Sequence, residues 1–170
     1  IYEQWGYCLE ETLFFAMPGQ KGQRQIRQIM NRLRCFYSLQ KDQGPSTEGC
    51  SNASAEEQTV AAFSEQAADL KLPGYLAGGK PITEILPDVV GFKDYLLGID
   101  NLPAGNVIKL YFADNSWLAM RPSGTEAKLK IYLSAKGEDA VLAQMRLLRL
   151  KQAAMELVGP DAVLADDDEG

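Results

Sequence analysis

The stretch that decides the fold is VIKLYFADNSWLAMRPSGTEAKLKIYLSAKGEDAVLAQMRLLRLKQAAMELVGP, residues 107–160. It opens with an apolar-rich segment, 107–113, which is typical of a β-strand. The turn pair 114–115, an Asp-Asn dipeptide, separates it from a second predicted strand over 116–120. Segment 128–134 alternates strictly between apolar and polar side chains, which predicts a third strand.

A long helix is predicted over 138–158, after the third strand. Glu138 and Asp139 place acids in its first turn, and Gly159-Pro160 stands just past its end. This is the asymmetry expected from the helix dipole and from C-terminal capping. We therefore expect a three- or four-stranded antiparallel sheet over about 94–134 with this helix packed on one face.

The N-terminal half is less regular. Residues 1–5 resemble the end of a helix, followed by a turn at Gly6 and an extended run around 13–17. From Gly22, apolar residues recur at helical spacing, and the opposite face is strongly basic up to Lys41. That basic face is either a solvated surface or a surface that binds an anion or a partner.

The middle of the chain contains a polar segment, 42–58, rich in small residues, which predicts a flexible connection or insertion. Residues 55–70 have the spacing of an amphipathic helix. The acidic run 166–169 at the C-terminus has nothing in its context to fix a metal-binding geometry, so it is interpreted as a frayed end.

Composition excludes several classes of function. The 170 residues carry a formal charge of −6, which disfavours coating of nucleic acid or an anionic membrane. No histidine is present, so Ser-His-Asp or Cys-His catalysis and histidine-ligated zinc are excluded. Three cysteines without a Cys-x-x-Cys pair favour a reducing, cytoplasmic compartment. No apolar run has the length of a membrane helix, and the start at Ile1 indicates a piece of a longer protein.

The loop 121–127 carries the groups of an anion site. Arg121 offers a planar fork for two oxygens, and Ser123 and Thr125 add hydroxyls. Gly124 permits a positive φ and close approach of the backbone, so successive N–H groups can converge on an anion.

In the next predicted strand, alternation places Lys128 and Lys130 on one face. Between Arg121 and Lys136 four basic residues accompany one acid, although the whole chain is acidic. The alternative is an ordinary hairpin turn flanked by solvated lysines.

Arg-Pro-Ser-Gly-Thr-Glu at 121–126, followed by Lys-x-Lys-x-Tyr, resembles the phosphate-binding loop of the α-D-phosphohexomutases, the phosphoglucomutase and phosphomannomutase family. The Ile-Tyr-x-x-x-Gly-Tyr stretch at 1–7, the helix from Gly22 and the Asp94-Tyr95 pair follow in family order. The resemblance implies an α+β fold, a small antiparallel sheet with helices on one face, like the TATA-binding protein. It also implies a division into 1–20, the end of a preceding domain and linker, and 21–170, a C-terminal phosphate-binding domain.

The resemblance further implies that the phosphate of a hexose phosphate is held by Arg121, Ser123, Gly124, Thr125, Lys130 and Lys128. Ala127 replaces the usual proline of the motif, which removes no ligand. The family also uses a phosphoserine loop, a magnesium loop and a sugar-selecting loop. None of these occurs in this sequence, so this chain contains no catalytic residues or metal ligands of its own.

Two functions follow from the resemblance as expectations. The first is the C-terminal part of a phosphoglucomutase or phosphomannomutase, an isomerase that transfers a phosphoryl group within a hexose phosphate. It would be inactive as this chain alone. Its Mg²⁺ would be bound outside this chain, glucose 1,6-bisphosphate would be the type of activator, and its partners would be the substrate and the enzyme's remaining domains.

The second is a non-catalytic sugar-phosphate-binding or regulatory module. A nucleic-acid-binding domain, using the basic helix, is a third interpretation that the acidic net charge disfavours. Neither a nucleic acid nor a membrane is expected as a partner.

Overall fold

The computed structural model describes residues 6–41, 80–99, 102–160 and 162–165. Its elements, in chain order, are β1 (Tyr7–Ala16), α2 (Gly19–Lys41), α4 (Ile82–Ile85), β2 (Val89–Asp94), β3 (Ile108–Phe112), β4 (Trp117–Pro122), β5 (Lys128–Gly137), α5 (Ala140–Val158) and β6 (Val163–Ala165). The predicted helix at 55–70 and insertion at 42–58 lie outside the described residues, as do the predicted helix end at 1–5 and the acidic run at 166–169.

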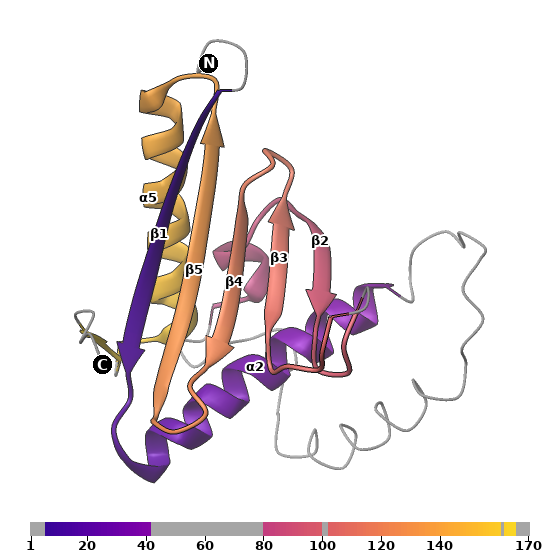
Figure 1. Ribbon diagram of the computed structural model, residues 1–170, viewed down its shortest axis with the longest axis vertical. Coiled ribbons are helices and arrows are strands. Elements are labelled where there is room, and N and C mark those ends of the chain that lie inside the picture. The colour runs from indigo at the N-terminus through magenta and orange to yellow at the C-terminus, as the bar shows by residue number, and fades with distance from the viewer. Residues whose placement is uncertain (1–5, 42–79, 100–101, 161, 166–170) are drawn as a thin grey trace.

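The strands form one sheet in the order β2-β3-β4-β5-β1-β6, and every neighbouring pair is antiparallel. The described helices lie together behind this sheet, and its other face is open (Figure 1). The prediction of an α+β fold with helices packed on one face of an antiparallel sheet is therefore confirmed. None of the helices described is both long and apolar enough to cross a membrane.

The sheet is larger than the sequence predicted. β1 pairs with β5 over ten residues and with β6 on its other side, so residues 7–16 form a central strand. β1 thus belongs to the same sheet as the later strands, and the division into 1–20 and 21–170 stays a prediction. The extended run expected around 13–17 overlaps the end of β1. Its full length did not show as alternation, because Leu13 and Phe15 are buried while Phe14, on the open face, is also apolar.

The C-terminal elements follow the prediction closely. Asn115 has a φ of 63° in the predicted turn, and Asp114 Oδ1 accepts a hydrogen bond from the Ser116 N–H at 2.9 Å. α5 begins after Asp139, whose carboxylate caps the helix by accepting from the Leu142 N–H at 2.7 Å. Gly159, with a φ of 89°, ends it. One difference matters for function: β4 continues through Pro122, so Arg121 lies in a strand and not in the loop.

The core lies between the helices and the inner face of the sheet. α2 contributes Ile26, Ile29, Met30 and Leu33, as its spacing predicted. These side chains pack with the inner side chains of the strands, among them Ile108, Leu118, Met120, Leu129, Ile131 and Leu133. The inner face of the sheet is thus filled, and its outer face is where polar side chains collect.

The buried Tyr37 is predicted to make the folded protein less stable at alkaline pH. Its ring is 7% exposed and stacks on Phe92 with centroids 5.3 Å apart. Burial raises the pKa of the Tyr37 hydroxyl far above its ordinary value. Above about pH 10 the unfolded chain therefore loses this proton while the native state keeps it, and stability falls with pH, by up to about 1.4 kcal/mol per unit.

Phenylalanine at position 37 should remove this contribution. The unfolding free energy of Tyr37→Phe, measured by urea titration, is expected to fall less steeply above pH 10 than that of the wild type. Tyr132→Phe, on the open sheet face, is the matched control and should keep the wild-type slope. Identical slopes for wild type and Tyr37→Phe would contradict the argument.

Candidate functional site

The connection between β4 and β5 is anchored at both ends by backbone hydrogen bonds. The Ser123 N–H donates to the Lys128 carbonyl at 2.8 Å, which closes the loop across its base. The Met17 N–H donates to the Ala127 carbonyl at 2.8 Å, which ties the loop to the segment between β1 and α2. Residues 123–127 are therefore held at one end of the sheet, beside the start of α2 (Figure 1).

Two cations face each other across the strands at this end. Arg121 of β4 stands directly opposite Lys130 of β5. Met120, beside Arg121, is fully buried, whereas Arg121 is exposed, so the arginine lies on the open face of the sheet. Opposed residues have Cβ atoms roughly 5 Å apart. Among the described residues, neither cation forms an ion pair with a carboxylate.

Lys130 is further positioned by an aromatic ring. Its Nζ lies 5.1 Å from the centroid of Phe14, the residue that faces it in β1. The attraction between a cation and the face of a ring limits where the ammonium group can go. Lys130 thus shares one patch of the open face with Arg121.

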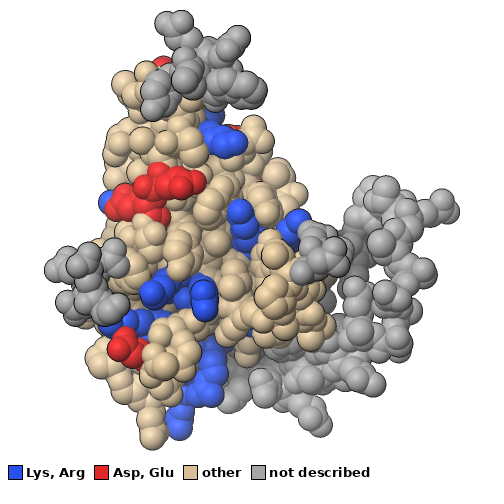
Figure 2. All heavy atoms as spheres, in the orientation of Figure 1, with Lys and Arg blue, Asp and Glu red and all other residues tan. Residues whose placement is uncertain are grey.

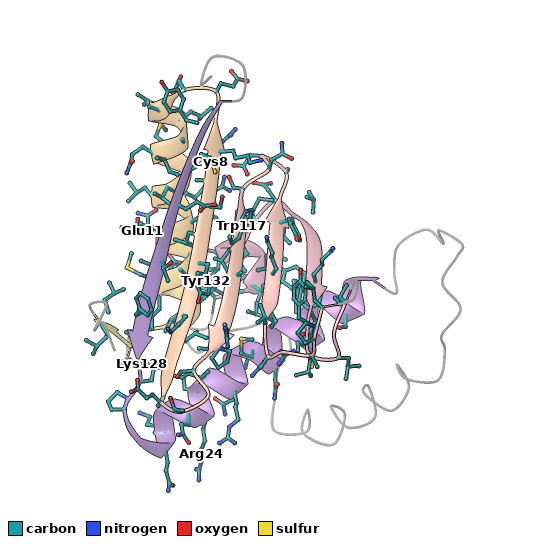
Figure 3. The ribbon with its side chains drawn as sticks, in the orientation of Figure 1. Cys8, Glu11, Arg24, Trp117, Lys128 and Tyr132 are labelled. Atoms are coloured by element: carbon teal, nitrogen blue, oxygen red, sulfur yellow. The ribbon has the colours of Figure 1, made fainter. Side chains whose placement is uncertain are left out.

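Lys128 is in a different situation. Its Nζ forms an ion pair with Glu126 Oε2 at 2.9 Å. The hydrogen bond from Lys128 and its charge, with that of Lys130, lower the pKa of the Glu126 carboxyl. Lys128 therefore lies near the predicted site but its charge is largely offset by a neighbour. Figure 3 shows it at the end of the sheet where the loop lies.

The loop offers fewer backbone donors than the sequence suggested. The Ser123 N–H is used inside the protein, so it is not available to an anion. Within the described part of the chain, the N–H groups of Gly124 and Thr125 have no partner. Both residues are exposed. Two donors, rather than three, therefore remain.

Gly124 leaves room for close approach to the backbone, as expected, but does not adopt a positive φ. Its φ is not in the left-handed region, and a Cβ added there would meet no atom within 4 Å. Neither the backbone nor the protein's own packing requires glycine at this position. What the glycine leaves is open space directly above the backbone, through which a ligand can approach its N–H.

Basic side chains from other elements extend the positive charge. Arg24, near the start of α2, lies at the same end of the molecule as Lys128 (Figure 3). The N-terminus of α2, with its partial positive charge, also lies here. Figure 2 shows lysine and arginine gathered over the middle and the loop end of the open face, with acidic side chains toward the end where β1 begins.

Lys109 is a feature that the sequence analysis did not identify. Its Nζ lies 3.8 Å from the centroid of the Trp117 ring and 5.2 Å from that of Tyr111. Burial, together with the nearby charge of Lys93, lowers the pKa of the Lys109 amine. Lys109 lies one strand away from Arg121. The alternation in β3 predicts that Lys109 and Tyr111 share a face, but only strand pairing brings Trp117 to them.

Comparison with known proteins identifies the family to which the chain belongs. Residues 52–149, more than half of the chain, match the model of the phosphoglucomutase/phosphomannomutase C-terminal domain. The chain belongs to this phosphohexomutase family. The matched range includes Arg121, the loop and Lys130, so the candidate site lies inside the family's domain.

Phosphoglucomutases of staphylococci are among its relatives. That of Staphylococcus saprophyticus is 31% identical over 140 residues, which are 82% of this chain but 19% of the relative. That of Staphylococcus aureus MRSA252 is 49% identical over 47 residues, 28% of this chain and 8% of the relative. That of Staphylococcus epidermidis RP62A is 58% identical over 33 residues, 19% and 6% of the two chains. The chain thus spans less than a fifth of the length of these relatives.

The described residues do not form a magnesium site. They contain no group of three or more aspartate, glutamate, cysteine or histidine side chains close enough to hold a metal ion. The Mg²⁺ that the family leads us to expect does not fit the residues described here.

Proposed function

We propose that this chain is the C-terminal part of a phosphoglucomutase or phosphomannomutase and that its Arg121 site binds the phosphate of a hexose phosphate during phosphoryl transfer. The Arg121 site consists of Arg121, Lys130, Ser123, Gly124 and Thr125. The observation that carries the proposal is the opposed pair of Arg121 and Lys130, which no carboxylate of the described residues neutralises.

These groups are complementary to a phosphate. The Arg121 guanidinium can donate two parallel hydrogen bonds to two phosphate oxygens. The N–H groups of Gly124 and Thr125 are unpartnered in the described chain and can donate to a third oxygen. Lys130 adds a point charge from the neighbouring strand. Lys128, already paired with Glu126, is a weaker ligand in this proposal.

Such a site acts through position rather than through chemistry. It holds the phosphate that does not react, and this places a sugar hydroxyl at the reactive centre contributed by the rest of the enzyme. Binding energy from a remote phosphate is thereby used to orient the reacting group. The anchoring of the loop at Ser123 and Ala127 keeps the donors fixed before the ligand arrives.

Titration of the ¹⁵N-labelled chain with glucose 6-phosphate tests the site. The amide signals of Gly124 and Thr125 are expected to move most, whereas that of Ser123 should move less because its N–H is already bonded. Unphosphorylated glucose is the matched control and should move none of them. Shifts that spread over β2 and β3 but spare the loop would contradict the assignment.

A mutase assay separates the enzyme from a non-catalytic module. The chain alone should give only background conversion of glucose 1-phosphate to glucose 6-phosphate, because it lacks the serine, metal and sugar-selecting loops. The longer protein should turn the substrate over with magnesium and the bisphosphate activator. A longer protein that binds hexose phosphates but converts none would instead support a regulatory module.

A further inference from the structure

α5 is apolar on two opposite faces. Its inner face is buried against the sheet through residues that include Ala143, Leu147, Leu150, Ala154 and Leu157. Its outer face also carries large apolar side chains: Val141 is 69% exposed, Met145 63% and Leu148 55%. The flanks of α5 are charged, but a row of large exposed apolar side chains is typical of a surface that contacts a partner. The outer face of α5 has no such partner in the described part of the chain.

The three exposed side chains form one line along the helix, which we call the α5 patch: Val141, Met145 and Leu148. Their spacing of four and then three residues is that of a helix surface which packs into another apolar surface. A hollow of about 350 Å³ adjoins Met145, between α5 and the β3–β4 turn, and its lining includes Phe112 and the ion-paired side chains of Arg146 and Arg149. A partner could therefore pack against the protruding side chains of the α5 patch and insert a side chain into the adjoining hollow.

The position of the patch indicates what covers it. The chain reaches the sheet at Tyr7, whose β-partner is Gly137, three residues before α5 begins. The start of β1 therefore lies near the first turn of α5, where Val141 lies. Figure 1 shows the start of β1 and the start of α5 at one end of the molecule and the 123–127 loop at the other.

The length of the relatives indicates which partner covers the α5 patch. The S. saprophyticus relative is about five times longer than the segment matched here, which covers 19% of it. An apolar surface that is exposed in a piece of a protein is a normal sign of an interface with the remainder.

We propose that the α5 patch is the surface on which the preceding domain of the same polypeptide packs. This rests on the proposed function only in taking the chain as part of a longer enzyme. The contact lies at the end of the sheet remote from the Arg121 site. β1 has ten residues and spans roughly 33 Å, so the preceding domain is held without covering the loop.

The five methionines of the chain provide a test without any substitution. Met145 is in the patch, and Met155, 41% exposed, lies further along α5, beyond Gln152. Met17, Met30 and Met120 are at most 2% exposed and serve as buried references. Oxidation by hydrogen peroxide, followed by mass spectrometry, gives the rate for each methionine, because exposure governs its conversion to the sulfoxide.

In the chain alone, Met145 should be oxidised at least as fast as Met155. In the full-length protein, the rate at Met145 relative to Met155 should fall about tenfold, because the preceding domain covers it. Leu148→Glu in the full-length protein should restore the faster rate. Val90→Glu, at a 69% exposed position on β2, is the matched control and should leave Met145 protected.

An unchanged ratio in the full-length protein would overturn the proposal. So would protection of Met145 in the chain alone that grows with its concentration, because a second copy would then occupy the patch. Failure of the α5 patch proposal can be distinguished from failure of the proposed function. The methionine oxidation rates are measured without substrate, and binding of glucose 6-phosphate by the loop is measured in a separate experiment.

Discussion

Replacement of Arg121 by alanine in the full-length enzyme is expected to raise the KM for a hexose phosphate about 10- to 100-fold. A charge-assisted, bidentate contact contributes about 1.5–3 kcal/mol, whereas the neutral donors of the loop contribute about 1 kcal/mol each. Arg121 is the only side chain at positions 121–127 with such a fork. We expect phosphorylation of the enzyme's serine, which lies outside this chain, to be nearly unchanged.

Two variants control this prediction. Arg121→Lys keeps the charge but loses the fork, so it should recover only part of the affinity. Lys136→Ala removes one positive charge from β5, six residues from Lys130, and should leave KM within about twofold of the wild type. Steady-state kinetics and phosphoserine occupancy, measured side by side, separate binding from phosphorylation. If Arg121→Ala leaves KM and kcat unchanged, the loop is a structural turn.

Replacement of Arg34 by alanine should produce the largest loss of stability. Arg34, on α2, is 6% exposed, and its Nε donates to Asp94 Oδ2 at 2.7 Å. Its Nη2 donates to Asn106 Oδ1 at 2.6 Å, so one side chain ties α2 to β2 and to the segment before β3. Removing one partner of a buried pair costs about 3–5 kcal/mol. Since Asp94 is 25% exposed, we expect about 2–4 kcal/mol.

Urea unfolding of the chain measures this loss. Arg27→Ala, at an exposed position on the same helix, should change the unfolding free energy by less than about 0.5 kcal/mol. The double variant Arg34→Met, Asp94→Leu should regain part of the stability, because no buried charge is then left unpaired. A loss no greater for Arg34→Ala than for Arg27→Ala would mean that the pair contributes nothing.

The C-terminal part of the fold could be predicted because each local signal agrees with the next. Residues 128–134 alternate and form part of β5, and Gly159 ends α5, both as expected. Asp139 caps α5 instead of lying in its first turn, because the helix begins at Ala140. β1 could not be placed in the same way. Its apolar residues fall on both faces, since Phe14 packs under Lys130, and its partner β5 lies more than 100 residues away in the sequence.

The candidate site, too, could be predicted only in part from local sequence. Local sequence indicates which residue types carry the chemistry, and the family motif places Arg121, Gly124, Thr125 and Lys130 together. The pairing register of β4 and β5 determines how these residues are arranged. Arg121 faces Lys130, and the Ser123 N–H donates a hydrogen bond to the Lys128 carbonyl, so it is not available to a ligand. The stacking of Lys109 on Trp117 depends on the β3–β4 pairing and has no separate signal in the sequence.

The position of the phosphate itself is the most direct test of the central claim. A crystal structure of the chain grown with glucose 6-phosphate should place the phosphate between the Arg121 guanidinium and the N–H groups of Gly124 and Thr125, within hydrogen-bond distance of each. Lys130 should approach the same group from β5. A phosphate held elsewhere, such as beside Lys93 and Lys109, with the loop empty, would contradict the account.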